Sequence, residues 1–364
     1  MVENVFIMGA TGKVGRELIS QIYKSGDTDH DVHANPTMIV GVASSTSILY
    51  NKQGLKEEES SAFGSKSLRG SGYKGLQALF EFIRNEDSLR VVDTTSSPDM
   101  LDFHRRVISE TRHTIITANK LPLAECSFEE FKALTFEHKR YSYNCSVMAG
   151  ADAVPFLRDL SDLGERPSKV VGSFSGTLGY VISEIEKGRN LSEILKEAKD
   201  KGYTEPNPAV DLSGRDVATK MLILARSAGI NANMKEIALM PFVPSEHLSH
   251  RNSEELICSL KDLDVEFKNA MANAKKDGCT LRYVARLDVR DSAHEITVGL
   301  KKLPLEHQLA QLRGTANKVI ISAGPYGFRG NTEYSLEAPG AGIDITARNI
   351  RRDLLHLICE RKIR

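Results

Sequence analysis

Short apolar runs recur through the first 150 residues of the chain, and a stripe of apolar residues at helical spacing follows the first of them. Between the first two runs, Val14, Leu18 and Ile22 recur at this spacing and predict an amphipathic helix. Polar, Gly- and Ser-rich stretches at 24–37 and 50–75 have no periodicity and predict surface loops. The runs that predict buried strands are Val5–Met8, Met38–Val42, Leu89–Asp93 and Thr114–Thr117.

Two helical stripes lie between residues 190 and 230. One covers Leu191–Ala198 and the other covers Val217–Ala228. Ser213 is a natural N-cap for the second helix, and Asp216 three residues later completes a capping-box-like start. Gly229 predicts the end of that helix.

From about residue 280 the pattern changes to alternation between apolar and polar positions. The predicted strands are Leu281–Val289, Ile296–Leu300, Lys318–Ser322 and Glu333–Glu337. They predict an antiparallel sheet that either covers the helices or forms a dimer interface. A last helix is predicted by Ile350, Leu354, Leu355 and Ile358.

Composition limits the classes of partner. A chain of 364 residues more often forms two domains than one. Lys plus Arg and Asp plus Glu both number 48, so the net charge gives no sign of nucleic acid or anionic lipid as a partner. No long apolar run predicts a membrane span, and no secretory signal is evident at the N-terminus. Five scattered cysteines without a CxxC pair are typical of reduced thiols, so we expect a cytoplasmic protein.

A glycine-rich turn follows the first strand and precedes the first helix. Its glycines are Gly9, Gly12 and Gly15. Glycine lets the backbone approach a pyrophosphate, and a helix N-terminus offers unpaired N–H groups, so this order predicts a dinucleotide site. The spacing is GxxGxxG, so Thr11 and Gly12 are expected to approach the phosphates most closely. The residues expected to bind the cofactor here are Gly9, Thr11, Gly12, Lys13, Val14 and Gly15.

The end of the second strand bears on the choice of cofactor. NAD-specific sites usually place Asp or Glu at this point to bind the ribose 2′-hydroxyl. Here Ser44 begins a run of hydroxyl residues, with Lys52 further along. A 2′-phosphate would meet no repulsion, so NADP(H) is favoured over NAD(H).

The residues Glu205, Asp211, Asp216 and Lys220 all fall in the short stretch 202–220. Asp216 and Lys220 are i, i+4 neighbours and project side by side from the first turns of the predicted helix. Such pairs are usually solvated salt bridges. Glu205 and Asp211 lie just upstream, in and after the turn Gly-Tyr-Thr-Glu-Pro, and this concentration favours a functional site.

The GYTEP turn and the following Asp-Leu-Ser-Gly-x-Asp-Val-Ala-x-Lys run resemble the signature of homoserine dehydrogenases. These enzymes reduce aspartate 4-semialdehyde to homoserine with NAD(P)H. The resemblance implies a Rossmann-type doubly wound parallel sheet in residues 1–150, completed by 338–364. It also implies an α+β domain with an antiparallel sheet in 151–337, for substrate binding and homodimerisation.

The resemblance also implies roles for individual residues. Lys220 would donate and accept the proton, with Asp216 orienting it and Lys120 beside the nicotinamide. The residues implied to bind substrate are Glu205, Asp211, Gly176, Thr177 and Tyr203. Further cofactor contacts are implied for Thr95, Ser96, Lys120, Gly202, Glu205 and Gly342.

The segment Ser146-Val-Met-Ala-Gly150 resembles the part of these enzymes that holds a monovalent cation such as Na⁺. The ligands would be Asn144 and the carbonyls of Val147, Ala149 and Ala151. Asn144 stands where an acid is common, and Asp152 stands where the family has a proline.

Three alternatives remain open. Cys145 lies in an Asn-Cys-Ser segment similar to the nucleophile region of semialdehyde dehydrogenases, although a buried structural thiol is favoured because no histidine lies near it in sequence. A different amino-aldehyde or hydroxy-acid reductase could use the same scaffold. A catalytically silent NAD(P)-binding regulator would have no physical need for the Lys220, Asp216, Glu205 and Lys120 set.

Overall fold

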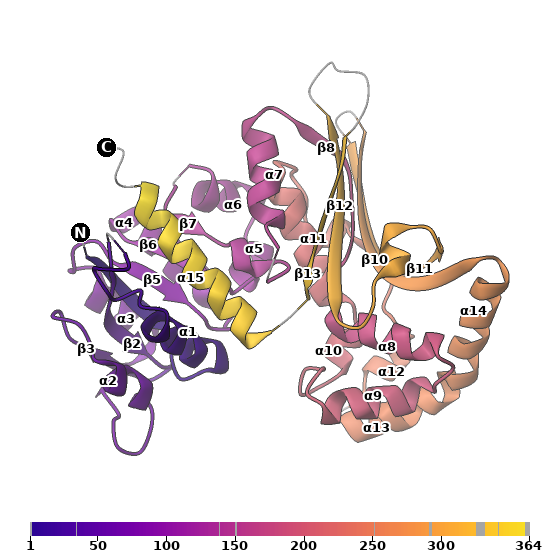
Figure 1. Cartoon of the computed structure of the whole chain (residues 1–364), viewed down its shortest axis with the longest axis horizontal. Coiled ribbons are helices and arrows are strands. Elements are labelled where there is room, and N and C mark those ends of the chain that lie inside the picture. Colours follow the sequence, from indigo (N-terminus) through magenta and orange to yellow (C-terminus); the bar gives the residue numbers. More distant parts are fainter. Residues whose placement is uncertain are drawn as a thin grey trace. The chain divides into compact units, whose positions relative to one another are not determined.

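The structure is a computed structural model that describes residues 2–33, 35–137, 139–149, 151–250, 252–290, 293–324, 332–340 and 342–360, with side chains as far as 356 (Figure 1). The chain divides into two compact units. Unit 1 comprises Met1–Gly150 and Gly342–Arg364, and unit 2 comprises Ala151–Ala341. The binding roles expected for the two parts of the chain remain predictions.

Unit 1 contains a seven-stranded sheet in the order β4-β3-β2-β1-β5-β6-β7. The five strands from β2 to β7 in this order pair in parallel, and β3 and β4 extend the edge in antiparallel fashion. The predicted parallel sheet is therefore confirmed. The strands are β1 Glu3–Met8, β2 Thr37–Ala43, β3 Ser47–Tyr50, β4 Ser71–Gly72, β5 Arg90–Asp93, β6 Thr114–Thr117 and β7 Tyr141–Ser142.

The helices of unit 1 include one that the sequence reasoning assigned to a loop. They are α1 Lys13–Lys24, α2 Glu57–Ala62, α3 Gly75–Ile83, α4 Met100–Glu110, α5 Leu121–Glu125, α6 Phe128–Thr135, the 3₁₀ turn η1 Asn144–Ser146, and α15 Ile343–Glu360. The prediction of a loop over 50–75 is wrong for α2, β4, the last residue of β3 and the first residue of α3. Helix α2 buries only Ser60 and so has no apolar stripe, but Glu59 caps its start by accepting from the Lys56 N–H at 2.8 Å.

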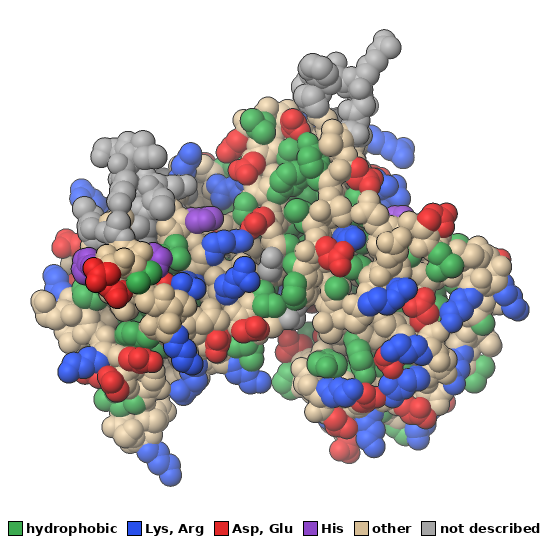
Figure 2. Space-filling model, in the orientation of Figure 1, with side chains coloured by type: hydrophobic (Ala, Val, Ile, Leu, Met, Phe, Trp, Pro, Cys, Tyr) green, Lys and Arg blue, Asp and Glu red, His purple; other side chains and the backbone are tan. Residues whose placement is uncertain are grey.

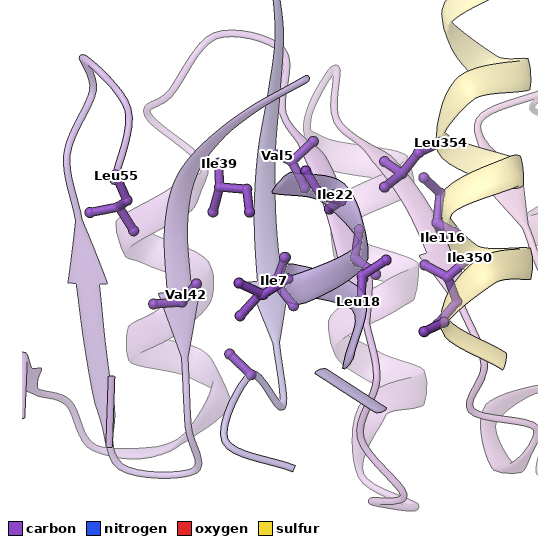
Figure 3. Packing of buried hydrophobic residues seen from close by; sticks show 14 of the residues in the cluster. Val5, Ile7, Leu18, Ile22, Ile39, Val42, Leu55, Ile116, Ile350 and Leu354 are labelled. Carbon is purple, nitrogen blue, oxygen red and sulfur yellow. The ribbon is translucent and has the colours of Figure 1, made fainter. Parts of the chain in front are cut away.

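Helices α1 and α15 cover one face of this sheet, although more than 300 residues separate them in sequence (Figures 1 and 3). Val5 and Ile7 of β1 pack against Leu18 and Ile22 of α1 in one buried cluster, which Ile350 and Leu354 of α15 complete. Full burial of a side chain such as Leu354 contributes about 1.5–3 kcal/mol. The helix predicted around Ile350 and Leu354 is confirmed; the side chain of Ile358 lies outside the described part.

An ion pair also fixes α15 to the loop after α1. The Arg351 guanidinium contacts both carboxylate oxygens of Asp27, at 2.7 Å for Nη2 and Oδ1, and His33 Nε2 lies 3.2 Å from the same Oδ1. Asp27 is 1% exposed. Removing one partner of a buried pair leaves the other charge without compensation.

We therefore expect Asp27→Asn to lower the free energy of unfolding by about 2–4 kcal/mol. Urea denaturation measures the change. Asp102→Asn is the matched control, because Asp102 pairs with Arg105 on the exposed face of α4, and we expect a change below about 0.5 kcal/mol. Equal effects for the two variants would contradict the anchoring role of Asp27.

Unit 2 is built on a six-stranded sheet in the order β13-β12-β8-β10-β11-β9. All neighbours pair in antiparallel fashion except β11 and the short β9. The predicted antiparallel sheet is confirmed. Its strands are β8 Arg166–Ser173, β9 Ala238–Leu239, β10 Cys279–Arg290, β11 Ala293–Pro304, β12 Ala316–Gly324 and β13 Thr332–Pro339.

Helices α8, α11 and α14 pack on this sheet against β10. The helices of unit 2 are α7 Ala153–Asp162, α8 Gly176–Glu186, α9 Leu191–Asp200, α10 Ala209–Leu212, α11 Arg215–Ser227, α12 Ser245–Leu248, α13 Ser253–Ser259 and α14 Asp264–Lys276, with 3₁₀ turns η2 Met234–Glu236, η3 Leu260–Leu263 and η4 Gln308–Gln311. Sequence reasoning predicted no helix between 245 and 276. The signal was present, because Leu256, Leu260, Leu263, Phe267 and Met271 recur at helical spacing and are all buried.

Acidic and basic side chains are interspersed over the visible face of each unit (Figure 2). No large area of one sign is seen there, as expected from the balanced composition. Within the described residues, no helix combines the length and apolar character that crossing a membrane requires.

Candidate active site

The glycine turn of unit 1 is closed so tightly that Gly9 and Gly15 have no space for a side chain. Gly9 has a positive φ of 74°, and the Gly12 N–H donates to Gly9 O at 2.9 Å. A Cβ on Gly15 would lie 2.4 Å from Gly9 O and 2.7 Å from Ala10 Cα, which is a steric clash. Helix α1 begins directly after Gly12, so the first N–H groups of the helix follow the turn. This geometry suits the close approach of a pyrophosphate.

Two loops follow the carboxyl ends of β5 and β6, where ligands bind in open parallel sheets. The Thr95 N–H donates to Asp93 Oδ1 at 2.8 Å, at the start of the first loop. Asn119 Nδ2 donates to Ser97 O at 2.8 Å and so ties the second loop to the first. Lys120 directly follows Asn119 and is the N-cap residue of α5. The structure therefore brings together the loops that contain Thr95, Ser96 and Lys120.

Ser44 begins the turn between β2 and β3. Its hydroxyl accepts from the Thr46 and Ser47 N–H groups at 3.3 and 3.1 Å. The Tyr73 hydroxyl donates to Ser44 O at 2.5 Å. No acidic residue occurs between 44 and 47, so no carboxylate within this turn would repel a 2′-phosphate.

The segment expected to hold a monovalent cation makes several internal hydrogen bonds. Asn144 Nδ2 donates to Asp353 Oδ1 at 3.1 Å, and the Ala149 carbonyl accepts from the Asn349 amide. Met148 between them has a positive φ of 48°. Asn144, Val147 and Ala149 belong to unit 1 and Ala151 to unit 2. Because Ala149 O already has a donor, the predicted ligand set fits a cation only in part, and it stays a prediction.

Cys145 has the surroundings of a structural thiol. It is buried, and its Sγ lies 3.2 Å from Thr117 O. Burial raises the pKa of the thiol well above its usual range. A thiol nucleophile needs the opposite shift, so the structure supports the buried-thiol interpretation.

In unit 2, Lys220 is held by two oxygen atoms. Its Nζ lies 2.8 Å from Asp216 Oδ2 and donates to Phe174 O at 2.7 Å. The Lys220 side chain is 12% exposed and that of Asp216 is 30% exposed, so the lysine is the more shielded partner of the pair. Phe174 lies two residues before α8. Its carbonyl gives Lys220 a second partner, which a simple surface salt bridge with Asp216 would not require.

A second group of hydrogen bonds connects α8 to the GYTEP turn. The Thr177 hydroxyl lies 2.7 Å from Tyr203 O and 2.9 Å from Asp211 Oδ1, and it can donate to either. The Glu205 N–H donates to Asp211 Oδ2 at 2.9 Å. The pKa of the Asp211 carboxyl is raised, chiefly by burial and further by Glu205 and Asp216. A cation bound at this carboxylate would stabilise its ionised form and so lower its pKa.

The side chains of Tyr203 and Glu205 are both exposed, and Gly202 has a positive φ of 71°. The Tyr203 ring stacks edge-on against Tyr180, with centroids 5.1 Å apart. The structure therefore brings Thr177, Tyr203, Glu205 and Asp211 together, and it places Lys220 and Asp216 beside the residues that lead into α8.

The start of α11 differs from the prediction. Ser213 is not the N-cap and makes no capping box with Asp216. The N-cap is Gly214, whose φ is 71°, and Ser213 Oγ accepts from the Arg215 N–H at 3.2 Å. A Cβ on Gly214 would lie 1.9 Å from Tyr283 Oη. The chain enters α11 through a left-handed residue with no space for a side chain, so a serine preference could not decide the position. Gly229 does end the helix, as predicted.

Comparison with known proteins assigns the family. A family model described as homoserine dehydrogenase matches residues 154–355, more than half of the chain. The chain belongs to the homoserine dehydrogenase family. The homoserine dehydrogenase of Schizosaccharomyces pombe is 28% identical over 368 residues, which cover 98% of this chain and 96% of that protein.

Bifunctional members of the homoserine dehydrogenase family are also similar. The aspartokinase/homoserine dehydrogenase of Haemophilus influenzae is 29% identical over 363 residues, covering 98% of this chain and 43% of that protein. The chain spans less than half the length of these bifunctional relatives.

Among solved structures, a Candida auris protein of unknown function superposes with a TM-score of 0.84 at 25% identity, covering 98% of both chains. A hyperthermophilic archaeal homoserine dehydrogenase in complex with NADPH has a TM-score of 0.72 at 20% identity, covering 99% and 98%, and shows the same fold.

Sequence reasoning missed two contacts of the candidate site in this homoserine dehydrogenase family member. Thr315 lies against Gly176, because a Cβ added there would be 3.3 Å from Thr315 Cβ. The Phe174 carbonyl that accepts from Lys220 is the second. Neither is visible as a motif, because one is a lone threonine before β12 and the other is a backbone atom.

Proposed function

We propose that this chain catalyses the NAD(P)H-dependent reduction of L-aspartate 4-semialdehyde to L-homoserine, and the reverse oxidation, in the biosynthesis of threonine, methionine and isoleucine. The observation that carries the proposal is the Lys220 ammonium held between Asp216 and Phe174 O. Membership of the homoserine dehydrogenase family supports the choice of substrate.

The nicotinamide nucleotide supplies the hydride, which adds to the aldehyde carbon of the substrate. This addition leaves an alkoxide that must gain a proton. Lys220 would donate the proton from Nζ, and Asp216 would hold the ammonium in place and balance its charge. In the reverse direction, neutral Lys220 would accept the hydroxyl proton of homoserine. None of these steps requires the predicted cation.

Substrate binding would use the second group of residues. Asp211 and Glu205 would bind the substrate ammonium, and the raised pKa of the Asp211 carboxyl suits such a partner because a nearby cation favours the ionised form. Gly176 and Thr177 open α8, whose first N–H groups would donate hydrogen bonds to the substrate carboxylate. Tyr203 would line the pocket.

The proposal further includes a preference for NADP(H), a homodimer and a cytoplasmic location. The turn at Ser44 lacks an acid for a ribose 2′-hydroxyl, which supports NADP(H). Cys126, Cys145, Cys258 and Cys279 are all free thiols, which supports a reducing compartment.

The test is oxidation of NADPH and of NADH by the purified protein with aspartate 4-semialdehyde. We expect turnover with both and a higher kcat/KM with NADPH. Turnover of another amino-aldehyde or hydroxy-acid substrate alone would favour a different reductase. Binding of NADPH without any turnover would favour the silent regulator and reject the proposal.

A further inference from the structure

A buried line of polar side chains lies beneath the two loops at the carboxyl ends of β5 and β6. It consists of Asp93, the last residue of β5, His104 in α4 and Tyr141, the first residue of β7. Their side chains are 0%, 0% and 2% exposed. His104 Nε2 lies 3.2 Å from Asp93 Oδ2, and His104 Nδ1 lies 2.8 Å from the Tyr141 hydroxyl. All three residues belong to unit 1.

Burying the Asp93 carboxylate costs free energy, so hydrogen bonds and charged partners must compensate for the lost solvent. Asp93 Oδ1 accepts from the Thr95 N–H at 2.8 Å, and Oδ2 accepts from the Thr117 hydroxyl at 3.2 Å. Burial raises the pKa of Asp93, but the contacts with His104 and Thr95 outweigh this effect, so the pKa lies below its usual value. Asp93 is therefore a buried carboxylate at neutral pH rather than a neutral acid.

The groups that Asp93 holds lead directly to the predicted cofactor contacts. Thr95 is one of these contacts, and its peptide N–H is bound by Asp93 itself. The Thr117 hydroxyl also accepts from the Asn119 N–H at 2.9 Å. Asn119 in turn binds Ser97 O through Nδ2 and the Leu121 N–H through Oδ1, at 2.8 and 3.1 Å. Lys120 lies between the two residues fixed in this way.

We propose that Asp93, supported from behind by His104 and Tyr141, is a positioning residue that fixes the Thr95–Ser97 and Asn119–Lys120 loops for the nicotinamide ring. This inference rests on the proposed function, because it assigns the nicotinamide to these loops. Asp93 would not touch the reacting atoms. It would set the geometry of hydride transfer through the peptide of Thr95 and the side chains of Thr117 and Asn119.

Asp93→Asn keeps the shape and the acceptor for the Thr95 N–H, but it removes the charge and turns a second acceptor into a donor facing Thr117 and His104. We expect a fall in kcat of about 10- to 100-fold and weaker NADPH binding, with the KM for the semialdehyde nearly unchanged. The Kd is measured by titrating the protein with NADPH and following the fluorescence of the bound cofactor. Steady-state kinetics give the kcat and KM values. Tyr141→Phe removes only the hydroxyl that contacts His104, and we expect a smaller change in the same direction, roughly two- to tenfold.

Glu3→Gln is the matched control, because it disturbs an equally buried ion pair at the opposite ends of the same strands. Glu3 Oε2 lies 3.0 Å from Arg90 Nε, and Arg90 Nη1 donates to Thr114 Oγ1 at 2.7 Å; Glu3 and Arg90 are 4% and 3% exposed. We expect Glu3→Gln to lower the urea midpoint while leaving the NADPH Kd and kcat at wild-type values.

Three outcomes would overturn the inference. One is an Asp93→Asn variant with wild-type Kd and kcat, and another is the same kinetic loss in Glu3→Gln. If Asp93→Asn does not fold, Tyr141→Phe decides the question, and wild-type kinetics in that variant are the third outcome. A wild-type protein that binds NADPH without reducing the semialdehyde would reject the proposed function alone, since the comparison of Kd values still tests the positioning role. Failure of the wild type to bind NADPH would reject both.

Discussion

Lys220→Met is expected to lower kcat for reduction of aspartate 4-semialdehyde by about 10²- to 10⁴-fold, the range typical of a lost general acid. Methionine has a similar length and keeps the apolar contacts of the stem, so the fold should persist. It removes the proton donor between Asp216 and Phe174 O. Stopped-flow and steady-state oxidation of NADPH measure the change, and the NADPH Kd should remain close to that of the wild type because the proton donor is not a predicted cofactor contact.

Two further variants separate proton transfer from charge. Lys220→Arg keeps the cation but replaces the ammonium by a guanidinium, which does not readily give up a proton, so it should restore little of the lost rate. Lys196→Met is the control, because Lys196 is an exposed lysine on α9 outside the candidate site, and we expect wild-type kinetics. Recovery of most of the activity in Lys220→Arg would show that Lys220 acts as a charge, and full activity in Lys220→Met would move the proton chemistry to Lys120 or water.

Gly214→Ala is expected to destabilise the protein by about 2–5 kcal/mol, the sum of a left-handed backbone cost and of overpacking. The added methyl group would lie 1.9 Å from Tyr283 Oη and 2.8 Å from its Cζ. Tyr283 cannot yield easily, because it is 2% exposed and its hydroxyl donates to Met240 O at 2.7 Å. The strain falls on the start of α11, two residues before Asp216, so we also expect a lower kcat in the folded fraction. Urea denaturation and NADPH oxidation measure the two effects.

Gly188→Ala is the matched control for the backbone term. Gly188 also has a positive φ, 90°, but no atom lies within 4 Å of an added Cβ. It should lose only about 1–2 kcal/mol and keep full activity. Adding Tyr283→Phe to Gly214→Ala should recover part of the stability by removing the closest atom. Equal losses in Gly188→Ala and Gly214→Ala would show that the contact with Tyr283 does not matter.

Much of this fold can be predicted from the sequence, because the spacing of its apolar residues matches the strands and helices of the structure. Strands such as Val5–Met8 and Leu281–Val289 are recognisable from apolar runs and alternation. The first turns of α11 were harder, since the side chain that leaves no space for a Cβ at Gly214 is Tyr283, which is 69 residues away in sequence. Helix α2 was missed because it lacks an apolar stripe, and its stability depends on capping and on contact with α1.

The candidate site divides in the same way. Lys220 and Asp216 are neighbours on one helix, so their spacing places them together. The partners of Asn144 and Cys145 could not be predicted from spacing. Asp353 and Thr117 are distant from them in sequence and contact them only in the folded sheet and α15. His104 resembles any histidine on a half-apolar helix until the fold brings Asp93 and Tyr141 to its two nitrogens. Contacts between distant residues that carry no motif are therefore what the sequence alone could not supply.

The return of α15 to unit 1 has a consequence for the order in which the molecule can mature on the ribosome. Unit 2 is continuous in sequence, and all of its strands have been synthesised before α15 begins. The core of unit 1 still lacks Ala347, Ile350 and Leu354 at that time. Domains that are complete tend to fold during translation. The earlier-synthesised unit would therefore be the last to close, and the apolar side chains that α15 buries would stay exposed to the cell until α15 arrives.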